Sequence, residues 1–440
     1  MPYAFLGVTL LGALAVVNAY RPVRREPMTV PSFFAGWIVG ELPLQNLTWQ
    51  MAATVVFGVF GAFAAWPGWL GLAVAVAGWA GLVGLAVAGQ RAGRVVAEAL
   101  GQATGRPFPA VPVPPAPAWG RWWQLTRAVP LRSRSAELVK DVDYWGDGIH
   151  RHRLDVIRPR DIRPRDRPAA ADRGAPSGPD DRGPGTAGRG APVMVYVHGG
   201  AWVIGDKREQ GKPMLYELVA RGWVCVAVNY RLSPRATWPD HVVDVKRALA
   251  WVKEHIADYG GDPGFVAISG GSAGGHLAAL AALTAGDATW QPGFEGADTA
   301  VAACVPCYGV MDMTGDRSGS GKYGPGLLRL LERLVMKASA ADHPEVFEAA
   351  SPTLRVHDGA PPFFVLHGAN DTLVPVDVAR QFVAALRRVS TAPVAYAELP
   401  LAQHAFDVLA SLRCQATTAG VVAFLDAVRL SALRGQLDGD

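Results

Sequence analysis

Hydrophobic positions before Gln90 cluster in three long uncharged runs, at residues 3–20, 48–66 and 69–89. A membrane-spanning helix needs about 20 mostly apolar residues. The third run meets this length, the second comes close to it, and the first is short. Between the second and third runs, Pro67 and Gly68 predict a turn, flanked by tryptophans of the kind found at membrane interfaces. We therefore expect residues 1–95 to form a transmembrane helical region of about three spans, with buried helices of a soluble domain as the alternative.

Positive charges follow the first and third runs and predict a topology. Arg21, Arg24 and Arg25 follow the first run, and Arg91 and Arg94 follow the third. Arginines beside spanning segments favour the cytoplasmic side, and two or three spans place both clusters on one side. We therefore expect a multi-pass protein of the cell membrane with the chain after Arg91 in the cytoplasm.

The first run permits a second interpretation. Val17-Asn18-Ala19 resembles a signal-peptide cleavage site, although no Lys or Arg precedes the run. The run is therefore either a span or a cleaved signal, and a cleaved signal would carry the following segment outward.

Residues 96–137 predict a linker. The stretch 107–117 is rich in proline, which favours a semi-rigid chain. Three tryptophans interleaved with arginines follow, at Trp119, Trp122 and Trp123. Such a segment either lies on the membrane surface or packs its rings on the next domain.

From residue 138 the pattern changes to short β-rich runs that alternate with helical ones. This alternation predicts an α/β domain with a mostly parallel sheet over residues 138–430. The predicted strands lie at residues 139–144, 151–157, 193–197, 224–228, 265–268, 301–305, 363–366 and 394–399. Residues 158–192 are dominated by Arg, Asp, Pro, Gly and Ala and predict a disordered surface insert. Residues 431–440 form a tail.

Charge and cysteine usage narrow the function classes. The net charge of +4 comes from scattered arginines, whereas nucleic-acid binding needs a clustered basic patch, so no nucleic-acid partner is expected. The four cysteines provide no disulfide framework. Cys304 and Cys307 have a metal-ligand spacing, but their run is apolar and lacks a second pair, which favours buried small hydrophobic residues. We expect neither a metal nor a cofactor.

The sequence Gly270-Gly271-Ser272-Ala273-Gly274 joins a predicted strand to a helical segment. A nucleophile elbow needs this context, because small neighbours permit the tight turn that exposes the serine. Ser272 is the predicted nucleophile.

The strand at 193–197 ends in His198-Gly199-Gly200-Ala201-Trp202. Acyl transfer places negative charge on the carbonyl oxygen, and glycines let backbone N–H groups approach it closely. The predicted oxyanion-hole donors are Gly199, Gly200 and Ala273, the residue after the nucleophile. We expect His198 to shape the loop and not to act as the base.

A serine nucleophile needs a base, and the base needs an acid that orients it. On this scaffold the acid and then the histidine follow the serine along the chain. Asp371 follows the strand at 363–366, and His404 follows the strand at 394–399, so they are the predicted acid and base. Asp377 and His367 are the competing acid and base.

Five motifs stand in the order expected of a known family. They are His198–Trp202, Tyr230-Arg231-Leu232-Ser233-Pro234, Gly260-Gly261-Asp262-Pro263, Gly270–Gly275 and His367–Pro375. Over about residues 138–430 the chain resembles the hormone-sensitive-lipase-like carboxylesterases of the α/β-hydrolase fold. The resemblance implies a doubly wound, mainly parallel sheet and a triad of Ser272, His404 and Asp371. Ala201, Arg235 and the 158–192 insert depart from the common pattern.

These features predict a membrane-anchored serine carboxylesterase that acts on short- to medium-chain esters through an acyl-enzyme. The substrate would be a small-molecule or lipid ester, the bilayer would be its other partner, and the oligomeric state stays open. An arylformamidase-like amidase and a catalytically silent membrane interaction protein are the alternatives. Residues 313–349 are either a lid or a peripheral helix. Trp202, Trp238 and Tyr308 are either pocket walls or core.

Overall fold

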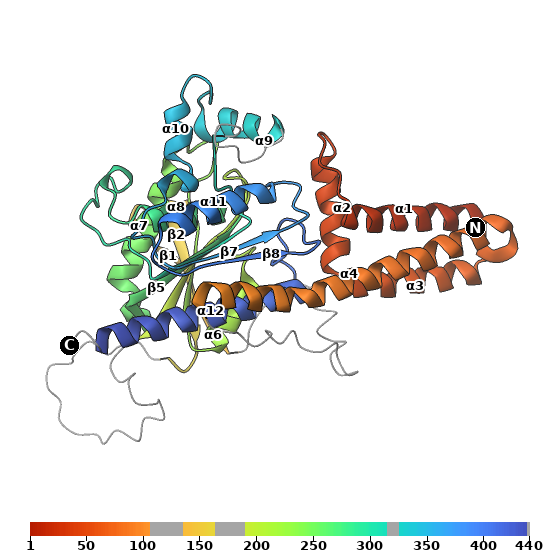
Figure 1. Ribbon diagram of the computed structural model, residues 1–440, viewed down its shortest axis with the longest axis horizontal. Coiled ribbons are helices and arrows are strands. Elements are labelled where there is room, and N and C mark those ends of the chain that lie inside the picture. The colour runs from red at the N-terminus through yellow and green to blue at the C-terminus, as the bar shows by residue number, and fades with distance from the viewer. Residues whose placement is uncertain (106–134, 163–189, 315–324, 438–440) are drawn as a thin grey trace, which may run out of the picture.

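The computed structural model describes residues 1–105, 135–162, 190–314 and 325–437 (Figure 1). The proline-rich linker, the tryptophan cluster after it and most of the 158–192 insert lie outside these ranges.

Eight strands form one sheet in the order β1-β2-β4-β3-β5-β6-β7-β8. The pairs from β4 to β8 are parallel, whereas β2 is antiparallel to both β1 and β4. Each predicted strand segment therefore forms a strand of a mostly parallel sheet. The bounds are β1 Ala136–Asp143, β2 Arg153–Pro159, β3 Ala191–Val197, β4 Val224–Val228, β5 Gly261–Gly271, β6 Ala303–Cys307, β7 Phe363–Gly368 and β8 Val394–Leu399.

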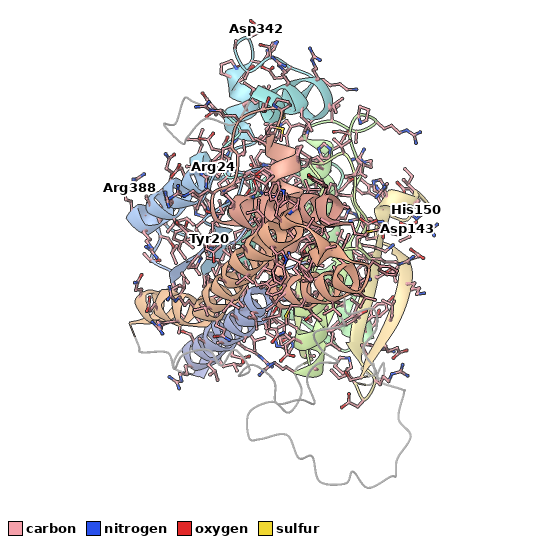
Figure 2. All side chains as sticks on the ribbon, turned by 90° about the vertical axis from the view of Figure 1, so that its right-hand side faces the viewer. Tyr20, Arg24, Asp143, His150, Asp342 and Arg388 are labelled. Atoms are coloured by element: carbon pink, nitrogen blue, oxygen red, sulfur yellow. The ribbon has the colours of Figure 1, made fainter. Side chains whose placement is uncertain are left out.

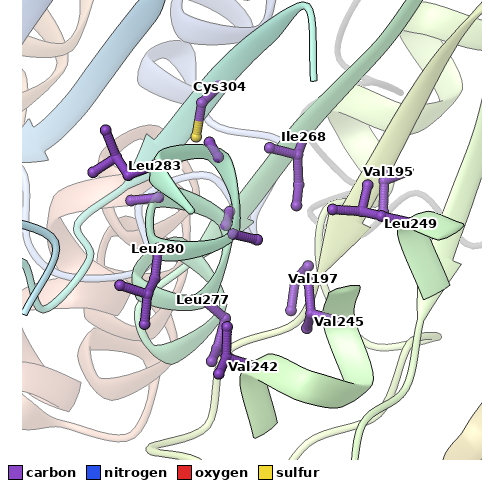
Figure 3. Close-up of a cluster of buried hydrophobic side chains, with 14 of the residues drawn as sticks. Val195, Val197, Val242, Val245, Leu249, Ile268, Leu277, Leu280, Leu283 and Cys304 are labelled. Carbon is purple, nitrogen blue, oxygen red and sulfur yellow. The ribbon is translucent and has the colours of Figure 1, made fainter. Parts of the chain in front are cut away.

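Helices cover both faces of this sheet. Along the inner strands, both the odd-numbered and the even-numbered residues are therefore buried. Val193, Val195 and Val197 point into one core with α7 (Asp240–His255), α8 (Ala273–Leu283) and α11 (Val376–Val389) (Figure 3). Met194 and Tyr196 point into a second core with α6 (Lys212–Ala220) and α12 (Leu412–Leu437). This double burial explains why the inner strands β3 to β7 are apolar runs without alternation, whereas the edge strand β1 is charged and only partly buried.

The segment between β6 and β7 contains the short helices α9 (Pro325–Leu330) and α10 (Pro344–Ala349), joined by a π-helical turn, Leu331–Met336. Leu331 and Val335 of this turn are buried in the first core. At least part of residues 313–349, for which the sequence leaves a lid or a peripheral helix open, is therefore packed on the domain.

The N-terminal region is a three-helix bundle that projects from the α/β domain (Figure 1). It consists of α1 (Pro2–Tyr20), α3 (Pro43–Val59) and the long α4 (Trp66–Thr104). Phe5 lies against Gly71, and the Tyr20 hydroxyl donates a 2.8 Å hydrogen bond to the Gly81 carbonyl, so α1 and α4 run parallel. Phe57 of α3 packs on Phe5, so α3 runs in the opposite direction. Figure 2 looks along the bundle toward the α/β domain.

The bundle differs from the predicted spans in two ways. The second run is helical only to Val59, and α3, with 17 residues, is not among the helices long and apolar enough to cross a membrane. The third run continues as one helix to Thr104, and Ala92, Val96 and Leu100 pack into the second core of the α/β domain.

Three described helices are long and apolar enough to cross a membrane: Pro2–Tyr20, Trp66–Thr104 and Leu412–Arg434. The last lies within α12, whose Ala416, Val421 and Phe424 are buried in the second core. The apolar face of α12 therefore packs against the sheet.

Candidate active site

Ser272 occupies a tight turn between β5 and α8. Its backbone has φ 57° and ψ −122°, a conformation that a residue other than glycine adopts only when the surroundings enforce it. Its N–H donates to the Cys307 carbonyl at 2.9 Å, which ties the turn to the end of β6. A Cβ at Gly274 would overlap the Val197 carbonyl oxygen, so this position needs glycine.

The glycine loop after β3 lies directly against this turn. A Cβ at Gly199 would be 3.1 Å from the Ser272 Cβ. Gly200 has φ 123°, which a side chain would strain. The Gly199 N–H donates to the Gln210 Oε1 at 2.8 Å. In this conformation it is therefore not available as the oxyanion-hole donor that the sequence predicts. Within the described residues, the Gly200 and Ala273 N–H groups have no hydrogen-bond acceptor.

His198 supports the loop, as expected. Its Nδ1 lies 2.8 Å from the Gly199 carbonyl oxygen, and Tyr230 donates to the His198 carbonyl oxygen at 3.1 Å. The side chain is fully buried, and this burial lowers the pKa of His198 to about 4. The ring is neutral at pH 7 and stacks on Tyr230.

Asp371 and His404 meet at the adjoining strand ends. His404 Nδ1 lies 2.7 Å from Asp371 Oδ2. Asp371 Oδ1 accepts the N–H groups of Leu373 and Val374 at 2.9 and 2.8 Å, which fix the carboxylate. Burial opposes ionisation, but the charge of His404 and the hydrogen bonds from His367 and His404 outweigh it and lower the pKa of Asp371.

The competing acid and base have other environments. Asp377 is half exposed and pairs with Arg380 on α11. His367 is fully buried, with Nε2 3.0 Å from the Val374 carbonyl oxygen and 3.3 Å from Asp371 Oδ2. His367 is therefore buried behind the Asp371 carboxylate. It cannot reach a substrate unless that carboxylate moves.

Tyr308 links the base to the serine turn. Its ring centroid is 4.5 Å from that of His404. Its hydroxyl oxygen would be 2.5 Å from a Cβ at Gly271, so only glycine fits there. The hydroxyl donates to Asp407, whose pKa burial raises. Within the described ranges, no hydrogen bond joins the Ser272 hydroxyl to His404. The structure thus brings the acid and base into contact, and Tyr308 contacts both the base and the turn that carries Ser272.

Several residues of this site carried no sequence signal. Gln210 and Asp407 are polar residues outside any motif, and only the fold brings them to the site. Phe33 and Trp37 belong to α2 (Thr29–Glu41), a segment with no assigned role, yet the Phe33 ring lies 6.1 Å from that of His404. Trp202 and Tyr308 are buried, and Trp238 is partly buried.

Other parts of the described chain include a pair of buried cysteines and a cavity far from Asp371 and His404. No group of His, Cys, Asp and Glu there could hold a metal ion. Cys304 and Cys307 are buried on β6. A cavity of about 420 Å³ lies beside β1, β2 and α6, lined in part by Asp155, Lys207 and Arg208. It is at the opposite edge of the sheet from Asp371 and His404, and both cations are paired with Asp155.

Comparisons with known proteins find carboxylic ester hydrolases among the relatives of this chain. The model of the BD-FAE family matches residues 183–386. The chain is 43% identical to the probable carboxylic ester hydrolase LipM of Mycobacterium tuberculosis over 99% of its own length and 95% of that protein. It is 47% identical to the esterase LipQ of the same organism, covering 69% of this chain and 66% of LipQ.

Solved structures share the fold. A truncated carbohydrate esterase from gut microbiota matches with a TM-score of 0.53 and 20% identity, over 69% of this chain and 97% of that one. An esterase from Thermogutta terrifontis matches with a TM-score of 0.50 and 22% identity, over 68% and 93%. The full-length similarity to LipM covers the N-terminal bundle as well as the α/β domain. The chain therefore belongs to the hormone-sensitive-lipase-like family of carboxylic ester hydrolases, which have the α/β-hydrolase fold.

Proposed function

We propose that this chain is a membrane-anchored serine carboxylesterase that cleaves short- to medium-chain esters with Ser272, His404 and Asp371. The observation that carries the proposal is the 2.7 Å contact between Asp371 and His404, beside a serine held at the N-terminus of α8. This order of acid, base and nucleophile is the one that acyl transfer needs.

In this mechanism, His404 Nε2 takes the Ser272 proton while the serine oxygen attacks the ester carbonyl. Asp371 accepts the Nδ1–H of His404, which keeps Nε2 free to receive that proton. The N–H groups of Gly200 and Ala273 stabilise the oxyanion. We assign Gly199 to shaping the turn, because Gln210 occupies its N–H in this conformation. His404 then protonates the leaving alcohol, and water hydrolyses the acyl-enzyme by the reverse path.

The test is Ser272→Ala, assayed on a panel of soluble chromogenic esters of increasing acyl length. Rates should fall by several orders of magnitude, because members of a triad act as a unit. Ser431→Ala, an exposed serine near the end of α12, is the matched control and should keep the wild-type rate. A folded Ser272→Ala protein that retains hydrolysis would refute the nucleophile assignment, and a rate that rises with long acyl chains would refute the length preference.

Two alternatives have their own readouts. An arylformamidase-like amidase would cleave formyl anilides faster than acyl esters. A catalytically silent protein would resist covalent labelling by a fluorophosphonate probe, which should instead modify Ser272 and not the Ser272→Ala variant.

The membrane assignment rests on the bundle. Most of the exposed large hydrophobic side chains belong to residues 1–87. If the parallel helices α1 and α4 both cross a bilayer, the chain must return between them, and the antiparallel α3 is the segment placed to do so. Its 17 residues span about 26 Å, slightly less than the roughly 30 Å hydrocarbon core. This arrangement puts both arginine clusters and the α/β domain at one end of the bundle, which favours a cytoplasmic domain.

A reporter that is active only in the cytoplasm, fused after Asp440, tests the topology and should be active. Protease added to sealed spheroplasts should leave the 158–192 insert intact. Cleavage there would overturn the orientation without affecting the esterase assignment.

A further inference from the structure

We propose that α2 lies in the lipid leaflet beside the bundle and that esters dissolved in the bilayer reach His404 along it. This inference rests on the proposed function and names its substrate class: esters that partition into membranes. It starts from the position of α2, which lies across the direction of α1 and α4, between the bundle and the α/β domain (Figure 1).

One face of α2 is docked on the loops that carry the candidate acid and base. The Trp37 indole N–H donates to the Ala405 carbonyl oxygen at 2.9 Å. The Thr372 hydroxyl donates to the Thr29 carbonyl oxygen at 3.2 Å. A Cβ at Gly36 would lie 3.5 Å from the Gln403 side chain. The helix is therefore in contact with both catalytic loops.

The C-terminal end of α2 is fixed by a buried ion pair. Arg413 Nη1 lies 3.0 Å from Glu41 Oε1 and 2.7 Å from the Gly40 carbonyl oxygen. Ser411 donates to the other Glu41 oxygen at 2.7 Å. These contacts hold α2 at one position relative to the site.

A second face of α2, turned away from the loops and from α1, is apolar and exposed. Val30, Phe34 and Ile38 are 51, 52 and 45% exposed, and their i, i+4, i+8 spacing aligns them in one stripe. In water such a stripe would cost free energy. The bundle also exposes apolar side chains, among them Leu14 and Val17 of α1.

The charges beside this stripe fit a membrane surface. Arg21, Arg24 and Arg25 precede α2 and are exposed, and Arg24 still donates to the Ala369 carbonyl oxygen at 3.0 Å. An apolar helix face flanked by arginines is typical of a helix in the interface of an anionic leaflet.

Aromatic rings connect the stripe to the catalytic base. The Phe34 centroid is 4.9 Å from that of Phe33, and the Phe33 centroid is 6.1 Å from that of His404. Trp37 stacks on Phe33 at 5.7 Å. Phe33 is therefore the apolar side chain that contacts both the exposed stripe and His404, and we infer that an apolar ester reaches His404 along it.

The position of α2 can be tested by fluorescence quenching in vesicles of phosphatidylcholine and phosphatidylglycerol that contain spin-labelled phospholipid. A thiol-reactive dye would be placed at Phe34→Cys, at Leu11→Cys in α1, and at Leu354→Cys, an exposed residue of the α/β domain. The four native cysteines are buried and should not react. We expect quenching at the first two positions and none at the third.

Quenching needs no turnover, so it separates this inference from the proposed function. Quenching at Leu11→Cys but not at Phe34→Cys would overturn the placement of α2 and leave the anchor standing. If neither position is quenched, the anchor fails and the inference fails with it.

The route can be tested by kinetics. Val30, Phe34 and Ile38 would be changed together to serine, and kcat/KM compared for a vesicle-embedded ester and a soluble ester. The ratio of kcat/KM for the vesicle-embedded ester to kcat/KM for the soluble ester should fall by about tenfold or more. Each substitution to serine removes the favourable free energy of transferring an apolar side chain from water into lipid. The matched control changes Ile149, Leu354 and Val389, also exposed apolar residues, to serine and should leave the ratio unchanged. An unchanged ratio in the α2 variant would refute the route.

Discussion

Asp371→Asn should abolish catalysis by inverting the hydrogen-bond roles at His404. Asp371 Oδ1 accepts two backbone N–H groups, from Leu373 and Val374. In the variant only the amide oxygen can take that place, so the amide NH2 must occupy the position of Oδ2, 2.7 Å from His404 Nδ1. Two donors cannot face each other, so Nδ1 must become the acceptor and the proton moves to Nε2.

A proton on Nε2 prevents His404 from accepting the Ser272 proton. The expected loss is on the order of 10⁴ in kcat, the magnitude of this substitution in serine proteases. KM for a soluble ester should change little, because Asp371 is buried behind the base and does not touch substrate.

The assay is ester hydrolysis by the detergent-solubilised protein, with circular dichroism to confirm folding. Asp377→Asn is the matched control, because Asp377 is exposed and, among the described residues, its ion pair is with Arg380. It should stay within about twofold of the wild-type rate, since surface ion pairs contribute little. A folded Asp371→Asn protein with more than about a tenth of the activity would refute the reasoning, and so would an equal loss in Asp377→Asn.

Two further predictions concern stability. Arg413→Met should lower the free energy of unfolding by about 3–5 kcal/mol, because it leaves Glu41 buried without its cation. The double variant Glu41→Met, Arg413→Met should recover part of this loss, measured by thermal unfolding. A double variant that recovers no stability would contradict the account. Burial lowers the pKa values of His198, His241 and His276 to about 4 each, so the unfolded state binds more protons between about pH 6.5 and 4. The free energy of unfolding should therefore fall as pH decreases through this window. Groups with raised pKa values oppose the trend in part: His152, whose hydrogen bonds and the charges of Asp244 and Asp147 outweigh burial, and buried carboxyl groups such as Asp407 and Asp426. Stability that rises on acidification would contradict the assignment.

The sequence by itself determined the sheet and predicted the chemical groups of the candidate site. The strands from β3 to β8 are mostly apolar because helices cover both faces of the sheet, so hydrophobicity alone located them. Ser272, Asp371 and His404 follow strand ends, and parallel strands deliver their ends to one edge of the sheet. Family membership followed from motifs that such loops require.

Only the tertiary structure decided what surrounds these groups. Gln210 occupies the Gly199 N–H, and Phe33 of α2 reaches His404 from the other end of the chain. No local pattern encodes such contacts, because they depend on how distant segments pack. The full length of α4 could not be predicted from hydropathy for a similar reason. Hydropathy falls after Gly89, but the helix continues to Thr104 because Val96 and Leu100 pack on the α/β core. Residues 90–104 are amphipathic because one side meets the sheet domain, and a search for uniformly apolar runs ends where that packing begins.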